Sequence, residues 1–136
     1  MSARVHAGGC FCGAVRYRAT APAESLCLCH CTSCRRSAGA TPVAWGTFAL
    51  ERFTLERGAL AIHRSSEPVE RGFCVDCGTS LTYTHRERPA QIDVTLASLD
   101  EPASLVPDAH LWLADRVAWT ELHDRLPKFA GWRVGS

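Results

Sequence analysis

The stretch "RGFCVDCGTSLTYTH", residues 71–85, combines two strand-like runs with a tight turn between them. Cys74 and Cys77 form a C-x-x-C pair in that turn, and Gly78 follows directly. Such a turn lets two thiolates converge on one metal ion, and a glycine accommodates the backbone that it requires. The stretch therefore predicts a β-hairpin whose turn is a zinc knuckle.

Further short β-rich runs flank this hairpin on both sides, separated by Gly and Pro residues. Their spacing predicts a mainly β, antiparallel-sheet protein. One short helix is expected at "SCRRSAGA" (33–40), with Ser33 capping its start and Gly39 its end. We expect the tail at 110–132, which carries three of the four Trp residues, to wrap the sheet and complete the core. Further strands are predicted at 14–20, 23–30, 41–50, 51–58, 60–66 and 89–99.

The chain has 136 residues, of which 46% are hydrophobic and 21% charged, and its formal net charge is +1. This length fits one domain, residues 1–136, with an adequate core. The near-neutral charge argues against nucleic acid or an anionic membrane as a partner. No apolar run approaches the roughly 20 residues that cross a bilayer, and the N-terminal "MSARVHAGG" lacks the apolar core of a signal peptide. We therefore expect a cytoplasmic protein.

The eight cysteines fall into three tight groups. In a reducing compartment, clustered cysteines bind metal or do redox chemistry more often than they form disulfides. Zinc prefers four soft ligands in a tetrahedron. The simplest four-thiolate site joins Cys10 and Cys12 of "GGCFCGAV" to Cys74 and Cys77, which would tie two distant hairpins together. The spacing alone leaves open which groups meet.

The remaining four cysteines lie in "CLCHCTSCRR", residues 27–36. On a straight strand Cys27 and Cys31 have Cα atoms about 13 Å apart, whereas two ligands of one zinc need Cα atoms within about 9 Å. Cys29, Cys31 and Cys34 can share a zinc because the chain turns into the helix after Cys31. The alternative is that Cys27 or His30 completes the site after a bulge. We expect His30 to be a core histidine or a hydrogen-bond partner of the ligands.

Three thiolates around Zn²⁺ leave one position for water or substrate, which is typical of a catalytic site. Such a site carries a net charge near −1 and is a poor generator of hydroxide. It favours a substrate thiol, which loses its proton on binding and becomes a nucleophile. The sequence therefore predicts a reaction at the sulfur atom of a small thiol.

Four motifs together resemble the glutathione-dependent formaldehyde-activating family, also called the GFA or centromere-protein-V-type domain. They are "GGCFCGAVRY", "CHCTSCRRSAGA", "FCVDCGTSLTY" and "PDAHLWLADRVAWTELHDRLPKF", and the resemblance runs nearly end to end. It implies a β-tent fold similar to the Mss4-like zinc proteins. It also implies a structural zinc on Cys10, Cys12, Cys74 and Cys77 and a catalytic zinc on Cys29, Cys31 and Cys34.

The activity implied by the resemblance is a carbon–sulfur lyase reaction, the condensation of formaldehyde with glutathione to S-hydroxymethylglutathione or its reverse. Arg35, directly after the last ligand, would then meet a glutathione carboxylate. Cys27 is additional to the family's zinc pattern. We expect Trp45, Phe48 and Trp119 to pack in the core and His110 to be a structural histidine.

Two other functions fit the sequence. A non-catalytic zinc scaffold that binds a protein partner predicts two closed metal sites and an exposed apolar or basic patch. A redox sensor that pairs Cys27 with Cys29 or Cys31 predicts loss of zinc on mild oxidation.

Overall fold

The computed structural model describes residues 3–133, which form ten β-strands in two sheets and one α-helix, α1 (Thr32–Ala38). The mainly β expectation is confirmed. Within residues 3–133, no helix has the length and apolar character needed to cross a membrane. The strands are β1 (Val5–Gly9), β2 (Arg16–Thr20), β3 (Ser25–Cys29), β4 (Val43–Ala49), β5 (Phe53–Arg57), β6 (Ala61–Ser66), β7 (Val69–Phe73), β8 (Ser80–His85), β9 (Gln91–Thr95) and β10 (His110–Leu111). Short 3-10 turns lie at Leu50–Arg52, Leu96–Ser98, Pro102–Ser104 and Leu113–Asp115.

Every predicted strand is present, but two strands and one cap were not foreseen. The two unforeseen strands are β1, whose "VHAGG" ends in two glycines, and the two-residue β10. Helix α1 ends at Gly39 (φ 67°), as predicted, but Ser33 does not cap its start. The N-cap is Cys31, whose sulfur accepts a hydrogen bond from the Cys34 N–H at 3.2 Å.

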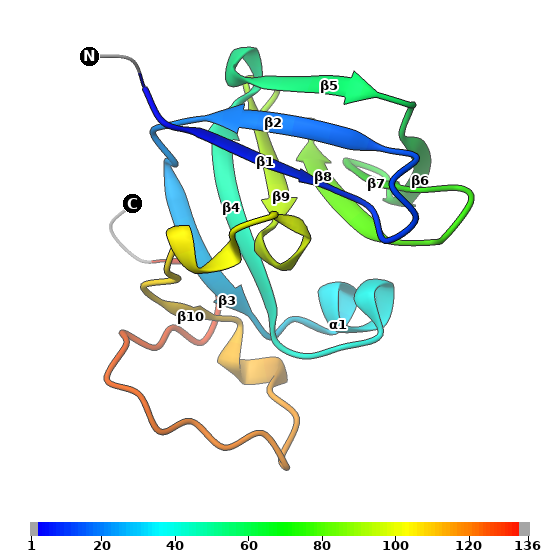
Figure 1. The fold of residues 1–136 in the computed structure, drawn as a ribbon. Coiled ribbons are helices and arrows are strands. Elements are labelled where there is room, and N and C mark those ends of the chain that lie inside the picture. Colours follow the sequence, from blue (N-terminus) through cyan, green and yellow to red (C-terminus); the bar gives the residue numbers. More distant parts are fainter. Residues whose placement is uncertain (1–2, 134–136) are drawn as a thin grey trace.

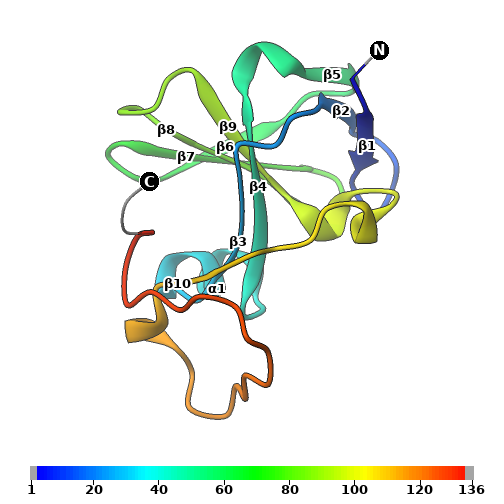
Figure 2. The same ribbon diagram turned by 90° about the vertical axis from the view of Figure 1, so that its left-hand side faces the viewer.

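The strands form a three-stranded sheet, β1–β2–β5, and a seven-stranded sheet in the order β10–β3–β4–β9–β8–β7–β6. Neighbouring strands of these sheets run antiparallel except β10 and β3, which run parallel. Figure 1 shows the small sheet lying across one end of β4, with α1 at the other end. Figure 2 shows the tail, from orange to red, beside β10 and α1.

Two hydrophobic clusters lie on opposite faces of β4, whose residues alternate between them. Phe48 packs with Tyr17 and Leu81 in the cluster that the small sheet covers. Trp45 belongs to the second cluster, which Phe129 of the tail helps to cover. The tail therefore completes a core, as predicted. Trp119 is an exception, because it is 74% exposed and its predicted packing is wrong.

Candidate metal centres and the cavity beside them

The structure brings Cys10, Cys12, Cys74 and Cys77 together, with all four sulfur atoms within 4.8 Å of one another. The Cys12 sulfur lies 3.7 Å from that of Cys10 and 3.8 Å from that of Cys74. A tetrahedral zinc with Zn–S bonds of about 2.3 Å places its sulfur ligands about 3.8 Å apart. The donor set and its spacing thus fit a closed zinc site.

Two turns present these four sulfurs, and each has a glycine directly after its second cysteine. Gly13 (φ 83°) follows Cys12 and Gly78 (φ 82°) follows Cys77, a backbone conformation that favours glycine. The prediction for Gly78 is confirmed. Cys10 and Cys12 lie in the turn that follows β1. Their sulfurs converge because the chain bends back.

Hydrogen bonds around this cluster favour the thiolate form of two of its members, Cys10 and Cys77. The Thr79 hydroxyl accepts a hydrogen bond from the Phe11 N–H at 3.0 Å and donates one to the Cys77 sulfur at 3.2 Å. The bond from Thr79 is the main cause that lowers the pKa of Cys77 to about 5. The Val15 N–H donates to the Cys10 sulfur at 3.2 Å. Thr79 therefore links the two turns, and it also favours the thiolate form of Cys77, which can bind a cation.

A second cluster joins Cys29, at the end of β3, to Cys31 and Cys34 at the start of α1, with the three sulfurs within 4.8 Å of one another. Hydrogen bonds from the Cys29 and Cys34 thiols lower the pKa of Cys31 to about 2. The same interaction with Cys31 raises the pKa of Cys29. The cluster thus holds one thiolate readily and, because like charges repel, needs a cation to hold three.

Neither residue considered as a fourth ligand joins this cluster. Among residues 3–133, no further Cys, His, Asp or Glu completes it. Cys27 lies two residues before Cys29 on the same face of β3, and burial raises the pKa of its thiol to about 12. His30 is fully buried, and its Nε2 lies 2.9 Å from Nδ1 of His110.

His110, the first residue of the tail, connects His30 to Asp124 further along the tail. Its Nε2 lies 2.8 Å from a carboxylate oxygen of Asp124, and this hydrogen bond lowers the pKa of Asp124. An ionised Asp124 fixes the proton of His110 on Nε2, so that Nδ1 accepts a hydrogen bond from His30. His110 is thus a structural histidine, as expected. Its acidic partner was not foreseen, because it lies 14 residues further along the chain.

Arg71 is a site residue that the sequence analysis missed. It is 5% exposed, and its Nη1 and Nη2 each lie 3.8 Å from the Cys34 sulfur. Its Nε donates to the Ser65 hydroxyl at 3.0 Å, and its guanidinium lies 5.1 Å from the centre of the Tyr83 ring. The available signal was its inward-facing position on β7, two residues after the buried Val69. A buried arginine needs an anion, and thiolates supply one.

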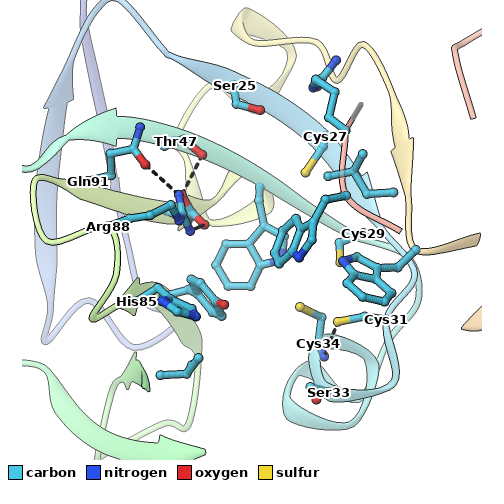
Figure 3. A pocket seen from close by; sticks show the side chains of 18 of the residues that line it. Ser25, Cys27, Cys29, Cys31, Ser33, Cys34, Thr47, His85, Arg88 and Gln91 are labelled. Carbon is cyan, nitrogen blue, oxygen red and sulfur yellow. Dashed lines mark hydrogen bonds and ion pairs between the residues drawn. The ribbon is translucent and has the colours of Figure 1, made fainter. Parts of the chain in front are cut away.

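The three cysteines open onto a cavity of about 1160 Å³ (Figure 3). Trp45 and Tyr83 line it with ring centres 5.9 Å apart, and Trp112 and Trp132 line it with ring centres 5.5 Å apart. Trp45 is therefore both a core and a cavity residue. Arg35, which the sequence analysis placed beside the substrate, is half-buried on α1 and is not among the residues that line the cavity.

Comparison with known proteins gives these features a family. Residues 5–115 match the family model described as "Glutathione-dependent formaldehyde-activating enzyme". A Halomonas elongata protein named "Putative glutathione-dependent formaldehyde-activating enzyme" is 26% identical over 133 residues, which cover 87% of this chain and 81% of that protein. A Schizosaccharomyces pombe protein named as an uncharacterised lyase is 31% identical over 91 residues, covering 65% of this chain and 66% of that protein.

Among solved structures, a Rhodobacter sphaeroides protein superposes with a TM-score of 0.58 at 26% identity. The match covers 74% of this chain and 97% of that one. The family model spans both cysteine clusters and Arg71 and ends at Asp115. By this match the chain belongs to the glutathione-dependent formaldehyde-activating family.

Proposed function

We propose that the chain is a zinc-dependent enzyme that forms or breaks a carbon–sulfur bond between a thiol and formaldehyde. The observation that carries this proposal is the three-cysteine cluster, which lacks a fourth protein ligand among residues 3–133 and faces a cavity. A four-ligand site would be structural, whereas a three-ligand site leaves a place for substrate. Glutathione is the thiol that the family name suggests.

The two clusters would then hold two zinc ions with different tasks. Cys10, Cys12, Cys74 and Cys77 would hold a structural zinc and connect the turns after β1 and β7. We also propose that the two sheets correspond to the β-tent of the Mss4-like zinc proteins. Cys29, Cys31 and Cys34 would hold the second zinc, which, when bound, lowers the pKa of a substrate thiol.

The reaction balances without any other reactant. The S–H bond of the thiol breaks, a bond forms between its sulfur and the formaldehyde carbon, and the proton ends on the former carbonyl oxygen. The product is an S-hydroxymethyl thioether, and the reverse reaction is the lyase direction. Arg71 balances the negative charge of the thiolates, while Trp45 and Tyr83 provide an apolar wall beside the sulfur.

The test is zinc content followed by turnover. We expect two zinc ions per chain in anaerobically purified protein and zinc-dependent exchange between glutathione, formaldehyde and S-hydroxymethylglutathione in NMR spectra. Cys29→Ser should lose one zinc and the catalysed exchange, and Cys27→Ser, outside the cluster, should keep both. Exchange at the uncatalysed rate in the two-zinc protein would refute the proposal.

A non-catalytic zinc scaffold is the second candidate, and one observation favours it. Phe11 and Val75, the residues that follow the first cysteine in each turn of the four-cysteine cluster, are 93% and 74% exposed. Large apolar side chains exposed at a rigid site are typical of protein contacts. The scaffold also requires the second site to be closed, and the three-cysteine cluster does not meet that requirement. Two zinc ions that a chelator removes equally slowly, with or without glutathione, would favour this candidate.

A further inference from the structure

A chain of hydrogen bonds connects the three-cysteine cluster with the surface of the tail. It begins at His30, which lies in the sequence between the candidate ligands Cys29 and Cys31. The ring of His30 contacts that of His110 at 2.9 Å, and His110 contacts Asp124 at 2.8 Å. The two histidines are 0% and 1% exposed, whereas the Asp124 side chain is 39% exposed. A carboxylate at the surface is thus connected, through two buried rings, to the segment that carries two of the three candidate ligands.

The direction of the His30 side chain matters for those ligands. Successive side chains of an extended segment point to opposite faces. Strand β3 ends at Cys29, and Cys31 still has an extended backbone, with φ −63° and ψ 149°. Both cysteines line the cavity and His30 does not, so its ring lies on the opposite side, against His110. A contact that holds the His30 ring on that side also holds both neighbouring sulfurs toward the cavity.

Backbone pairing alone is a short anchor for this segment. In the parallel pairing of β10 with β3, the Leu28 N–H donates to the Ala109 carbonyl and the His30 N–H to the Leu111 carbonyl, each at 2.9 Å. Strand β10 has only two residues, and parallel pairing is slightly less stable per residue than antiparallel pairing. The contact between the two histidine rings reinforces the pairing at this point.

The carboxylate at the other end of the chain is itself held within the tail. One oxygen of Asp124 contacts His110, and the other accepts a hydrogen bond from the Leu126 N–H at 3.0 Å. The Lys128 ammonium lies 3.5 Å from that second oxygen, and Lys128 also forms a parallel bridge with His110. Asp124 is therefore a fixed end to which the two rings can be tied.

Stability alone is a poor explanation for this chain. Because ionised Asp124 keeps the proton of His110 on Nε2, His30 donates from its own Nε2 and its Nδ1 is an acceptor. That atom is buried and has no hydrogen-bond partner among residues 3–133. A buried polar network that is only partly satisfied stabilises a fold less than apolar side chains of similar size would. Positioning of the neighbouring ligands explains the network better.

We propose that Asp124 is a positioning residue for the metal ion at the three-cysteine cluster. Acting through His110, it fixes the ring of His30 and with it Cys29 and Cys31. This inference rests on the proposed function, because it requires a zinc ion at that cluster, and it makes the tail part of the metal site. The match to the family model ends at residue 115, so it assigns no role to Asp124.

The test variant is Asp124→Asn, which keeps the size of the side chain but removes its charge and can turn an N–H donor toward His110. We expect the zinc Kd of the three-cysteine site to rise about 10-fold, as is typical when a partner behind a metal ligand is changed. The zinc Kd of the four-cysteine site should not change. Competition with a chelator, without thiol or formaldehyde, measures both constants. A general loss of folding stability would not single out one site.

Glu121→Gln is the matched control, because Glu121 lies in the same tail and pairs with His123, with both side chains about as exposed as each other at 78% and 82%. It should keep both wild-type zinc affinities. A double-mutant cycle then tests the connection: in a His30→Leu protein, Asp124→Asn should have no further effect, because the link is already broken. If His30→Leu does not fold, Asp124→Asn and its control decide alone.

An unchanged Kd at the three-cysteine site in Asp124→Asn, an equal rise at both sites, or full additivity with His30→Leu would overturn the inference. Turnover separates the two proposals. A wild-type protein that binds two zinc ions without catalysing exchange, and loses affinity in Asp124→Asn, refutes only the proposed function. A wild-type protein that catalyses exchange, with unchanged zinc affinity in Asp124→Asn, refutes only this inference.

Discussion

Replacing Arg71 by methionine should weaken zinc binding at the three-cysteine site and leave the four-cysteine site unchanged. Methionine keeps much of the arginine's length and apolar contact with Tyr83 but removes the guanidinium. The Cys34 sulfur then loses two N–H donors, each at 3.8 Å, and the positive charge of the guanidinium that carries them. The three thiolates would repel one another more strongly, so their protonated forms would compete better with the metal.

The size of the effect follows from the geometry. Two unit charges 3.8 Å apart interact by about 4 kcal/mol at an effective dielectric constant of about 20. The loss of this attraction is partly offset, because the methionine variant no longer has the free-energy cost of desolvating a buried guanidinium. Hydrogen bonds to charged groups contribute about 1.5–3 kcal/mol each at good geometry, and these two are long. We therefore expect a net loss of about 2–3 kcal/mol, or a zinc Kd raised about 30- to 150-fold.

The assay is competition with a chromophoric chelator, which resolves the two sites by their affinities. Ser65→Ala is the control, because it removes only the hydrogen bond from Arg71 Nε and leaves the contact with Cys34. Arg71→Lys keeps the charge without the paired donors and should fall between the two. Unchanged affinity at the weaker site in a folded Arg71→Met protein would show that Arg71 does not balance the thiolates.

Three further predictions concern other parts of the chain. Cys12→Ser should lose the tighter zinc and lower Tm strongly, whereas Cys29→Ser should lose the weaker zinc with a small change in Tm; equal shifts would contradict the assignment of the two sites. Cys27 should react with iodoacetamide at pH 8 far more slowly than a free thiol, because burial raises its pKa to about 12; rapid labelling would revive the redox-sensor hypothesis. Burial lowers the pKa of His6, so its contribution to stability is present above the unfolded pKa of about 6.5 and is lost as the pH falls below it. Urea unfolding at pH 7.5 and 5.5 should therefore show a smaller pH effect in His6→Gln than in the wild type.

The sequence predicted which cysteines come together within each short motif, because local geometry decides that, but it left open that Cys10 and Cys12 meet Cys74 and Cys77. A C-x-x-C-G turn fixes the backbone within a few residues, and the distance between Cys27 and Cys31 on a straight strand argued against a shared metal ion. In the structure β3 ends at Cys29, and Cys27 lies outside the three-cysteine cluster. Both arguments need only bond lengths and backbone conformations. The same holds for Gly39, whose left-handed conformation ends α1.

What the sequence did not predict depends on register between distant strands. Arg71 meets Cys34 because β7 and the start of α1 come together, and Asp93 meets Thr47 because β9 pairs with β4. The exposure of Trp119 depends on the course of the tail between β10 and Lys128. Local sequence patterns do not predict that course. The role of Arg35 stays a prediction: its closeness to Cys34 in sequence suggested a place in the site, and it is not among the residues that line the cavity.

The two clusters differ in what surrounds the sulfurs, and this difference explains why one chain would carry both. At the four-cysteine cluster, backbone and threonine donors from both turns hold the thiolates, so metal binding there contributes directly to folding. At the three-cysteine cluster, one sulfur also caps α1 and another contacts a buried arginine, so packing already fixes the ligands before any metal binds. A site prepared in this way does not need a fourth protein ligand for its geometry. The fourth coordination position can therefore be occupied by a substrate. Three protein ligands bind zinc less tightly than four, so the chelator experiment should find two zinc affinities.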